Sequence, residues 1–177
     1  MTAANVVTML RVALVPVIVF LLIEGLYPTA FAVFLLAGLS DAVDGAIARF
    51  FDQRSRLGVV LDPLADKLML VCVFVVLGFL DAVPVWLVIL VVSRDVVIVA
   101  GLGVAQLLGR PMPVRPLVVS KVNTAAQIAL AALVMLALAV GEPMTTLATV
   151  LVWVVAVSTA ASLAAYTLEW TRHIGAE

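Results

Sequence analysis

The stretch between residues 41 and 66 reads Asp41-Ala-Val-Asp44-Gly45-Ala-Ile-Ala48-Arg49-Phe-Phe-Asp-Gln-Arg-Ser55-Arg-Leu-Gly58-Val-Val-Leu-Asp62-Pro-Leu-Ala-Asp66. The spacing of its small and charged residues follows helical periodicity, which places the first two aspartates on one helix face and the last two on one face of the next helix. An ionised carboxylate at mid-bilayer depth costs about 2.5–3.5 kcal/mol. Four aspartates in an otherwise apolar setting therefore require something that compensates their charge.

The rest of the chain supplies that apolar setting. Of 177 residues, 66% are hydrophobic and only 12% are charged, and the mean hydropathy is +1.30. A soluble domain carries about a quarter charged residues, and a disordered chain has the opposite composition, so both classes are excluded. The net charge of −1 argues against a nucleic-acid partner. We expect a single membrane domain over residues 1–177, with no separate soluble domain.

Six apolar segments, separated by Gly, Pro and acidic residues, predict the secondary structure. Because only helices and closed barrels satisfy the backbone in lipid, and no strand-like alternation is visible, we expect an all-α protein with six membrane-spanning helices. Their predicted bounds are Val6–Ile23, Tyr27–Arg49, Leu61–Leu80, Val83–Leu108, Ser120–Val140 and Met144–Thr167.

The basic residues predict the topology. Arginines lie in connections two and four and in the C-terminal tail, with Lys121 just beyond the fourth connection. The three other connections hold an acidic residue each (Glu24, Asp81 and Glu142) and no basic residue. By the positive-inside rule both termini are expected to be cytoplasmic. Met1–Val7 contains no basic side chain, so neither a signal peptide nor a transit peptide is expected there. We expect a multi-pass protein of the bacterial inner membrane whose active site faces the cytoplasm; a processed organelle protein would show the same pattern.

The four aspartates predict a metal centre. A short connection makes the two acidic helices antiparallel neighbours, so their carboxylates can meet. Oxygen ligands without His or Cys select hard ions such as Mg²⁺, Mn²⁺ or Ca²⁺, and two bridged ions suit an in-line displacement at phosphorus. Gly45, Ala48 and Gly58 leave room for a large polar ligand, and Arg49 offers a fork of donors to phosphate. The alternative is a set of buried ion pairs, but only Arg49 and Lys67 are near enough to pair with the four aspartates.

The pattern Asp-x2-Asp-Gly-x2-Ala-Arg-x8-Gly-x3-Asp-x3-Asp resembles the signature of the CDP-alcohol phosphotransferase family at every position. The resemblance implies an enzyme that cleaves a CDP-linked substrate, releases CMP and joins the remaining phosphate to an alcohol. It implies that Asp41, Asp44, Asp62 and Asp66 hold two divalent cations, Mg²⁺ or Mn²⁺, with Ca²⁺ as an ion that can occupy the site. Asp66 is also implied as the general base.

The resemblance extends to the nucleotide site, whose implied residues are Gly45, Ala48, Arg49, Ser55 and Gly58. The segment from Asn5 to Arg11 resembles the family's entry segment, in which Asn5 and Thr8 help to hold the nucleotide. One departure is Ala4, where the family usually has proline. Helix capping is an alternative role for Asn5.

The flanking segments resemble those of CMP-forming cardiolipin synthases, one branch of the family. They include Arg94-Asp95 in the fourth helix and Ser120-Lys121-Val122-Asn123-Thr124 at the start of the fifth. This implies CDP-diacylglycerol and phosphatidylglycerol as substrates, a homodimer, and an acceptor site for which we predict Arg94, Lys121 and Asn123. The alternative is a phosphatidylglycerophosphate synthase, which uses glycerol 3-phosphate and shares the motif. Arg110 and Arg115 are more simply explained by topology or by attraction to anionic headgroups.

Two further classes of function are weaker alternatives. A divalent-cation transporter would need acidic residues across the membrane depth, whereas here they cluster at one end of two helices. An inactive lipid-binding homologue would be expected to have lost one of the motif aspartates, and none is lost.

Overall fold

The computed structural model describes the backbone of residues 3–50, 58–107, 118–142 and 145–174, and the side chains of 9–40, 67–101, 118–142 and 145–168. Within these ranges all regular structure is helical, which confirms the all-α prediction. The helices are α1 (Ala3–Ile23), α2 (Tyr27–Phe50), α3 (Gly58–Phe79), α4 (Val85–Leu107), α5 (Val118–Val140) and α6 (Thr146–Ile174). The predicted bounds agree within a few residues, except that α6 continues seven residues beyond Thr167.

Three turns of the same type join consecutive helices at one end of the bundle. Gly25, Asp81 and Gly141 each have a positive φ (73°, 54° and 73°) and directly follow the last turn of α1, α3 and α5. In each turn, the N–H of the residue after the positive-φ residue donates to the carbonyl five residues earlier. For example, the N–H of Leu26 donates to the carbonyl of Leu21 at 2.9 Å. This Schellman arrangement satisfies the last carbonyls of a helix and ends it. The predicted breaks at these positions are therefore confirmed.

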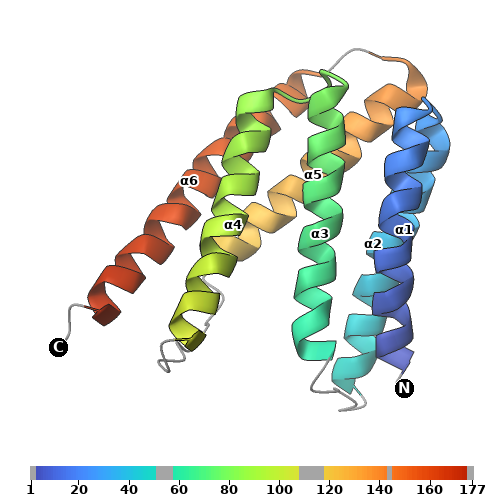
Figure 1. The fold of residues 1–177 in the computed structure, drawn as a ribbon. Coiled ribbons are helices and arrows are strands. Elements are labelled where there is room, and N and C mark those ends of the chain that lie inside the picture. The colour runs from blue at the N-terminus through green and yellow to red at the C-terminus, as the bar shows by residue number, and fades with distance from the viewer. Residues whose placement is uncertain (1–2, 51–57, 108–117, 143–144, 175–177) are drawn as a thin grey trace.

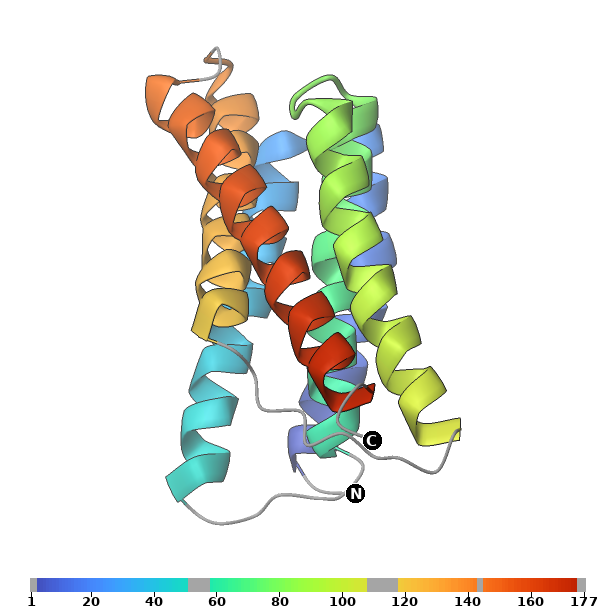
Figure 2. The ribbon, with the colours of Figure 1, turned by 90° about the vertical axis from the view of Figure 1, so that its left-hand side faces the viewer.

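Successive helices consequently alternate in direction, as Figures 1 and 2 show. The ends of α2, α4 and α6 and the starts of α1, α3 and α5 point away from the Schellman turns. The acidic motif is carried by the end of α2 and the start of α3, so both of its halves belong to this opposite end of the bundle.

The helices pack in two groups that share α5. Helix α1 packs against α2 and α3, while α6 packs against α4 and α5. Helix α5 crosses diagonally in Figure 1 and contacts α2 and α3 as well. Between the helices lies an apolar core in which Ile18, Phe74, Leu87, Leu130 and Val155 are fully buried. The core holds together the helices that carry polar side chains.

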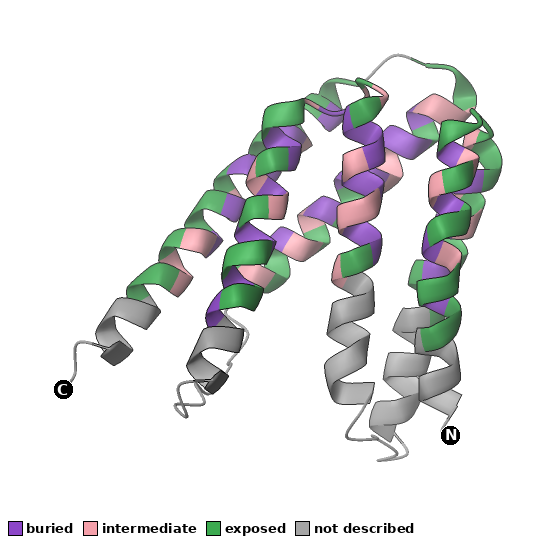
Figure 3. Cartoon of the chain, in the orientation of Figure 1, coloured by how far each residue is buried: buried purple, intermediate pink, exposed green. Residues whose placement is uncertain are grey.

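The outward faces of the bundle are apolar as well. Large side chains such as Phe20, Leu36, Ile89 and Trp153 are more than half exposed, and Figure 3 shows exposed positions along every helix. In the described ranges, α5 and the Thr146–Leu168 part of α6 are long and apolar enough to cross a membrane, and only 39% and 33% of their most apolar windows are buried. A core helix of a soluble protein would be mostly buried. An exposed apolar surface of this extent is typical of a lipid-facing protein.

Candidate active site

The structure positions the motif at the level of the backbone. Asp41 and Asp44 lie on α2 within ten residues of its end at Phe50, and α3 begins at Gly58, so Asp62 and Asp66 lie in its first turns. The predicted residues fall outside the described side chains, and Ser55 lies outside the described backbone: Asp41, Asp44, Asp62, Asp66, Asn5, Thr8, Gly45, Ala48, Arg49, Ser55 and Gly58. Their convergence on metal ions and nucleotide therefore stays a prediction.

Lys67, the residue that follows Asp66, belongs to a polar network centred on the buried Arg94 of α4. The Arg94 side chain is 2% exposed. Its Nη1 donates to Oδ1 of Asp95 at 2.6 Å, and its Nη2 donates to Oγ of Ser120 on α5 at 2.6 Å. Its Nε and Nη2 donate to Oγ of Ser162 on α6 at 3.2 and 2.7 Å. The guanidinium carbon lies 6.0 Å from the ring centre of Tyr166, within cation–π range.

Lys67 connects this network to α3. Its Nζ lies 3.2 Å from Oδ1 of Asp95, the same oxygen that accepts from Arg94. Asp95 is thus shared by two cations, and the side chains of Asp95 and Lys67 are 10% and 33% exposed. A buried arginine is stable only when paired and fully hydrogen-bonded. The network meets that requirement. Its two cations and one carboxylate leave one net positive charge, and one of the cations, Lys67, directly follows Asp66 in the sequence.

A second polar group lies deeper between α5 and α6. Oδ1 of Asn123 accepts hydrogen bonds from the hydroxyls of Ser158 and Thr159, both at 2.8 Å. Asn123 is fully buried and Gln127, one turn later, is 2% exposed. Within the described part of the chain, Nδ2 of Asn123 and Nε2 of Gln127 have no hydrogen-bond partner. The hydrogen bonds of Asn123 fix α5 against α6.

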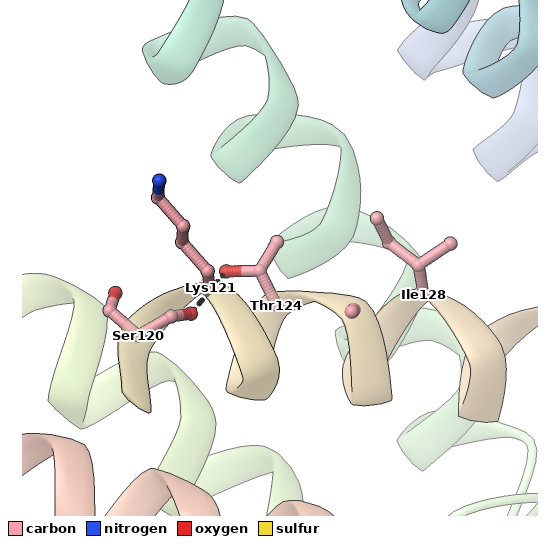
Figure 4. A pocket seen from close by; sticks show the side chains of 5 residues that line it. Ser120, Lys121, Thr124 and Ile128 are labelled. Carbon is pink, nitrogen blue, oxygen red and sulfur yellow. Dashed lines mark hydrogen bonds between the residues drawn. The ribbon is translucent and has the colours of Figure 1, made fainter. Parts of the chain in front are cut away.

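The other side of α5 borders an open groove of about 410 Å³. Ser120, Lys121 and Thr124 line its polar part, and Ala125 and Ile128 continue it with apolar side chains. Figure 4 shows the Lys121 and Ile128 side chains pointing to the same side of α5. Lys121 is exposed and has no ion-pair partner among the described residues. The groove therefore presents a free cation next to an apolar wall.

The structure separates the three residues that were predicted to bind an acceptor. Lys121 lies at the groove, whereas Asn123 points into the α5–α6 contact, because residues two positions apart on a helix face different sides. Arg94 also points inward, and its nitrogens are engaged by protein groups. Of the three, Lys121 is exposed, whereas Arg94 and Asn123 are buried, and the acceptor contact stays a prediction.

Sequence reasoning did not assign a role to Ser162 or to the Lys67–Asp95 pair. Ser158 and Ser162 lie one helical turn apart on α6, and that spacing was the available signal for a polar face directed at the neighbouring helices. Lys67 directly follows Asp66, but nothing in the sequence indicates that its partner is on α4.

Comparison with known proteins identifies relatives along most of the chain. The family model described as CDP-alcohol phosphatidyltransferase matches residues 1–161. The chain is 40% identical over 147 residues to the human protein named cardiolipin synthase (CMP-forming), covering 74% of this chain and 49% of that protein. The corresponding rat protein is 37% identical over the same length, with the same coverage of both chains. The chain thus spans about half the length of these relatives.

A relative whose name gives a different activity matches more of the chain. The rice chloroplast protein named CDP-diacylglycerol–glycerol-3-phosphate 3-phosphatidyltransferase 1 is 36% identical over 186 aligned residues, which cover 95% of this chain and 56% of that protein. Similarity therefore extends to proteins with two different names, cardiolipin synthase and CDP-diacylglycerol–glycerol-3-phosphate 3-phosphatidyltransferase.

The Arg94 network leads to a prediction about stability. Ser162→Ala removes the hydroxyl that accepts from Nε and Nη2 of Arg94 and leaves Nε without a hydrogen-bond partner among the described residues. We expect a loss of about 1–3 kcal/mol, the cost of a buried donor left unsatisfied, measured as a lower midpoint of thermal unfolding in detergent. Thr149→Ala on the same helix is the control, because Thr149 is exposed and bonds only the Thr145 carbonyl. Equal midpoints for the two variants would contradict the network.

Proposed function

The chain belongs to the CDP-alcohol phosphatidyltransferase family, and we propose that it is a membrane phosphatidyltransferase that makes cardiolipin and CMP from CDP-diacylglycerol and phosphatidylglycerol. The observation that carries the reaction class is the complete motif from Asp41 to Asp66, divided between the end of α2 and the start of α3. The names of the human and rat relatives support the acceptor. Because the chain spans about half of those proteins, substrates and partners belong to the proposal.

We propose that all six helices span the bacterial inner membrane and that residues 1–177 form one domain. The alternating helix directions and the exposed apolar side chains support this arrangement. The basic connections assign the end that carries the motif, and both termini, to the cytoplasm. The active site then faces the side on which water-soluble CMP is released. The homodimer implied by the family resemblance is part of the same proposal.

The donor set fits hard divalent cations, because Asp41, Asp44, Asp62 and Asp66 offer only carboxylate oxygens. Two Mg²⁺ or Mn²⁺ ions, when bound, would polarise the β-phosphate and neutralise the charge that develops on CMP. Ca²⁺ could occupy the same ligands. The four aspartates themselves would balance the charge of the ions and fix the diphosphate at the end of the bundle.

The remaining motif residues would bind and orient the nucleotide. Arg49 offers paired donors to a phosphate, and Gly45, Ala48 and Gly58 leave space for it beside the backbone. Ser55, Asn5 and Thr8 complete the proposed nucleotide contacts. Asp66 would accept the proton of the acceptor hydroxyl as that oxygen attacks the β-phosphorus in line with the departing CMP oxygen. The new oxygen–phosphorus bond gives cardiolipin, and the broken phosphoanhydride gives CMP.

The groove on α5 favours a lipid acceptor. Phosphatidylglycerol has one phosphodiester charge and two acyl chains, and the groove offers Lys121 beside Ala125 and Ile128. Glycerol 3-phosphate is a small dianion without an apolar part, and it would require several clustered cations. We propose that Lys121 contacts the acceptor phosphate, and that Arg94 and Asn123 act indirectly by holding α5 in place. The second candidate is phosphatidylglycerophosphate synthesis, which the rice relative's name favours.

An acceptor panel tests the proposed function. Purified protein with CDP-diacylglycerol and Mg²⁺ or Mn²⁺ is offered phosphatidylglycerol, glycerol 3-phosphate, inositol phosphate or serine, and CMP and lipid products are measured. We expect CMP and cardiolipin with phosphatidylglycerol, and no turnover by Asp66→Asn, because an amide does not accept the hydroxyl proton.

Two results of this panel would contradict the proposal. Product with glycerol 3-phosphate but none with phosphatidylglycerol would assign the protein to the second candidate function. Substantial activity of the Asp66→Asn variant would exclude Asp66 as the base.

Lys121→Met tests the acceptor contact. A hydrogen bond to a charged group is worth about 1.5–3 kcal/mol, so we expect the KM for phosphatidylglycerol to rise about 10- to 100-fold while the KM for CDP-diacylglycerol changes little. Val122→Ala is the matched control, because Val122 is the exposed neighbour and does not line the groove. An unchanged KM for phosphatidylglycerol in Lys121→Met would remove Lys121 from the acceptor site.

A further inference from the structure

A continuous series of polar contacts runs from the groove to the start of α3. Ser120 lines the groove and accepts from Arg94, Arg94 donates to Asp95, and Asp95 pairs with Lys67. Three helices are crossed in this way: α5, α4 and α3. The series ends one residue from Asp66. The groove and the motif are thus connected through side chains that lie outside both.

We propose that Asp95 is a positioning residue that holds Lys67, and with it the first turns of α3, in register with the groove on α5. This inference rests on the proposed function, in which Asp66 accepts the proton of a hydroxyl group bound at the groove. Proton acceptance and in-line attack require the two sites to be held at a fixed separation. An error of about 1 Å in such a placement can cost about 100-fold in rate.

The geometry assigns this role to Asp95 because its Oδ1 is the point at which the two cations meet. Arg94 is held on three sides by Asp95, Ser120 and Ser162, so it is a fixed element of the α4–α6 group. Lys67 is more exposed than Asp95, and Asp95 is its sole ion-pair partner among the described residues. Because Asp95 contacts both Arg94 and Lys67, it holds α3 in place relative to the fixed Arg94.

The charge balance supports the same role. Arg94 and Lys67 contribute two positive charges and Asp95 one negative charge. Asp95 lies between the two cations, so its negative charge offsets the repulsion between Arg94 on α4 and Lys67 on α3. Helices α3 and α4 also approach closely at Gly78 and Val88, near the turn that joins them. The Lys67–Asp95 ion pair is a second, directional contact between the two helices, away from that turn.

Asp95→Asn is the informative variant. The amide oxygen can still accept from Nη1 of Arg94, so the buried guanidinium keeps its hydrogen bonds, while the charge that attracts Lys67 is lost. We expect kcat to fall about 10- to 100-fold, with the KM values for both lipids within about threefold of the wild type. Ser93→Ala is the matched control, since Ser93 is the exposed neighbour and bonds only the Leu90 carbonyl of its own helix.

A double-mutant cycle separates positioning through Lys67 from a general loss of structure. Lys67→Met should lower kcat by a similar factor, and Asp95→Asn combined with Lys67→Met should be no slower than the slower single variant, because both remove one interaction. Independent, multiplying effects would overturn the proposal, as would wild-type kcat in Asp95→Asn or a change confined to KM.

A distance measurement tests the proposal without activity. Spin labels are placed at Leu68→Cys on α3 and Val122→Cys on α5, both exposed, in a Cys72→Ala background. We expect a narrow distance distribution that broadens or shifts in Asp95→Asn and not in Ser93→Ala. An unaltered distribution in Asp95→Asn would overturn the positioning role. If the parent protein releases no CMP, the proposed function fails, and this distance measurement still decides the role of Asp95.

Discussion

Charge placed between apolar helices must be compensated locally, and this constraint organises the molecule. The bundle has an apolar core and exposes large apolar side chains, so a buried ion there depends on protein groups to replace its lost hydration. Arg94 satisfies the constraint by engaging Asp95 and two serines from neighbouring helices. Because these partners come from α4, α5 and α6, satisfying one guanidinium also fixes the relative positions of three helices.

The same constraint explains why the polar chemistry is gathered towards one end. The Schellman turns at the other end are short and need only backbone hydrogen bonds. The opposite end carries the motif aspartates, the Arg94 network and the polar part of the groove. In the proposed function a charged lipid headgroup reacts there while its acyl chains stay in the bilayer. The proximity of Lys121 to Ala125 and Ile128 suits such an amphiphilic molecule.

Much of the fold was predictable because its signals are local. Helix bounds followed from apolar runs, and the breaks at Gly25, Asp81 and Gly141 followed from loop-forming residues. In the structure each of these three residues has a positive φ. The family was predicted from the motif between Asp41 and Asp66, and the match to the family model confirms the family. The site was less predictable because helix rotation and side-chain direction depend on tertiary packing. Lys121 and Asn123 belong to one sequence segment, yet they face opposite sides of α5. For Arg94, the sequence alone does not distinguish an arginine that binds a ligand from one that is buried in a network of protein groups.

In the proposed function, the four motif aspartates hold two divalent cations between the end of α2 and the start of α3. Diffraction from crystals grown with Mn²⁺, recorded at the manganese absorption edge, can locate these ions. We expect two neighbouring anomalous peaks, each within bonding distance of oxygens from Asp41, Asp44, Asp62 or Asp66, at the end of the bundle away from the Schellman turns. No peak at these carboxylates, or peaks only at other residues, would contradict it.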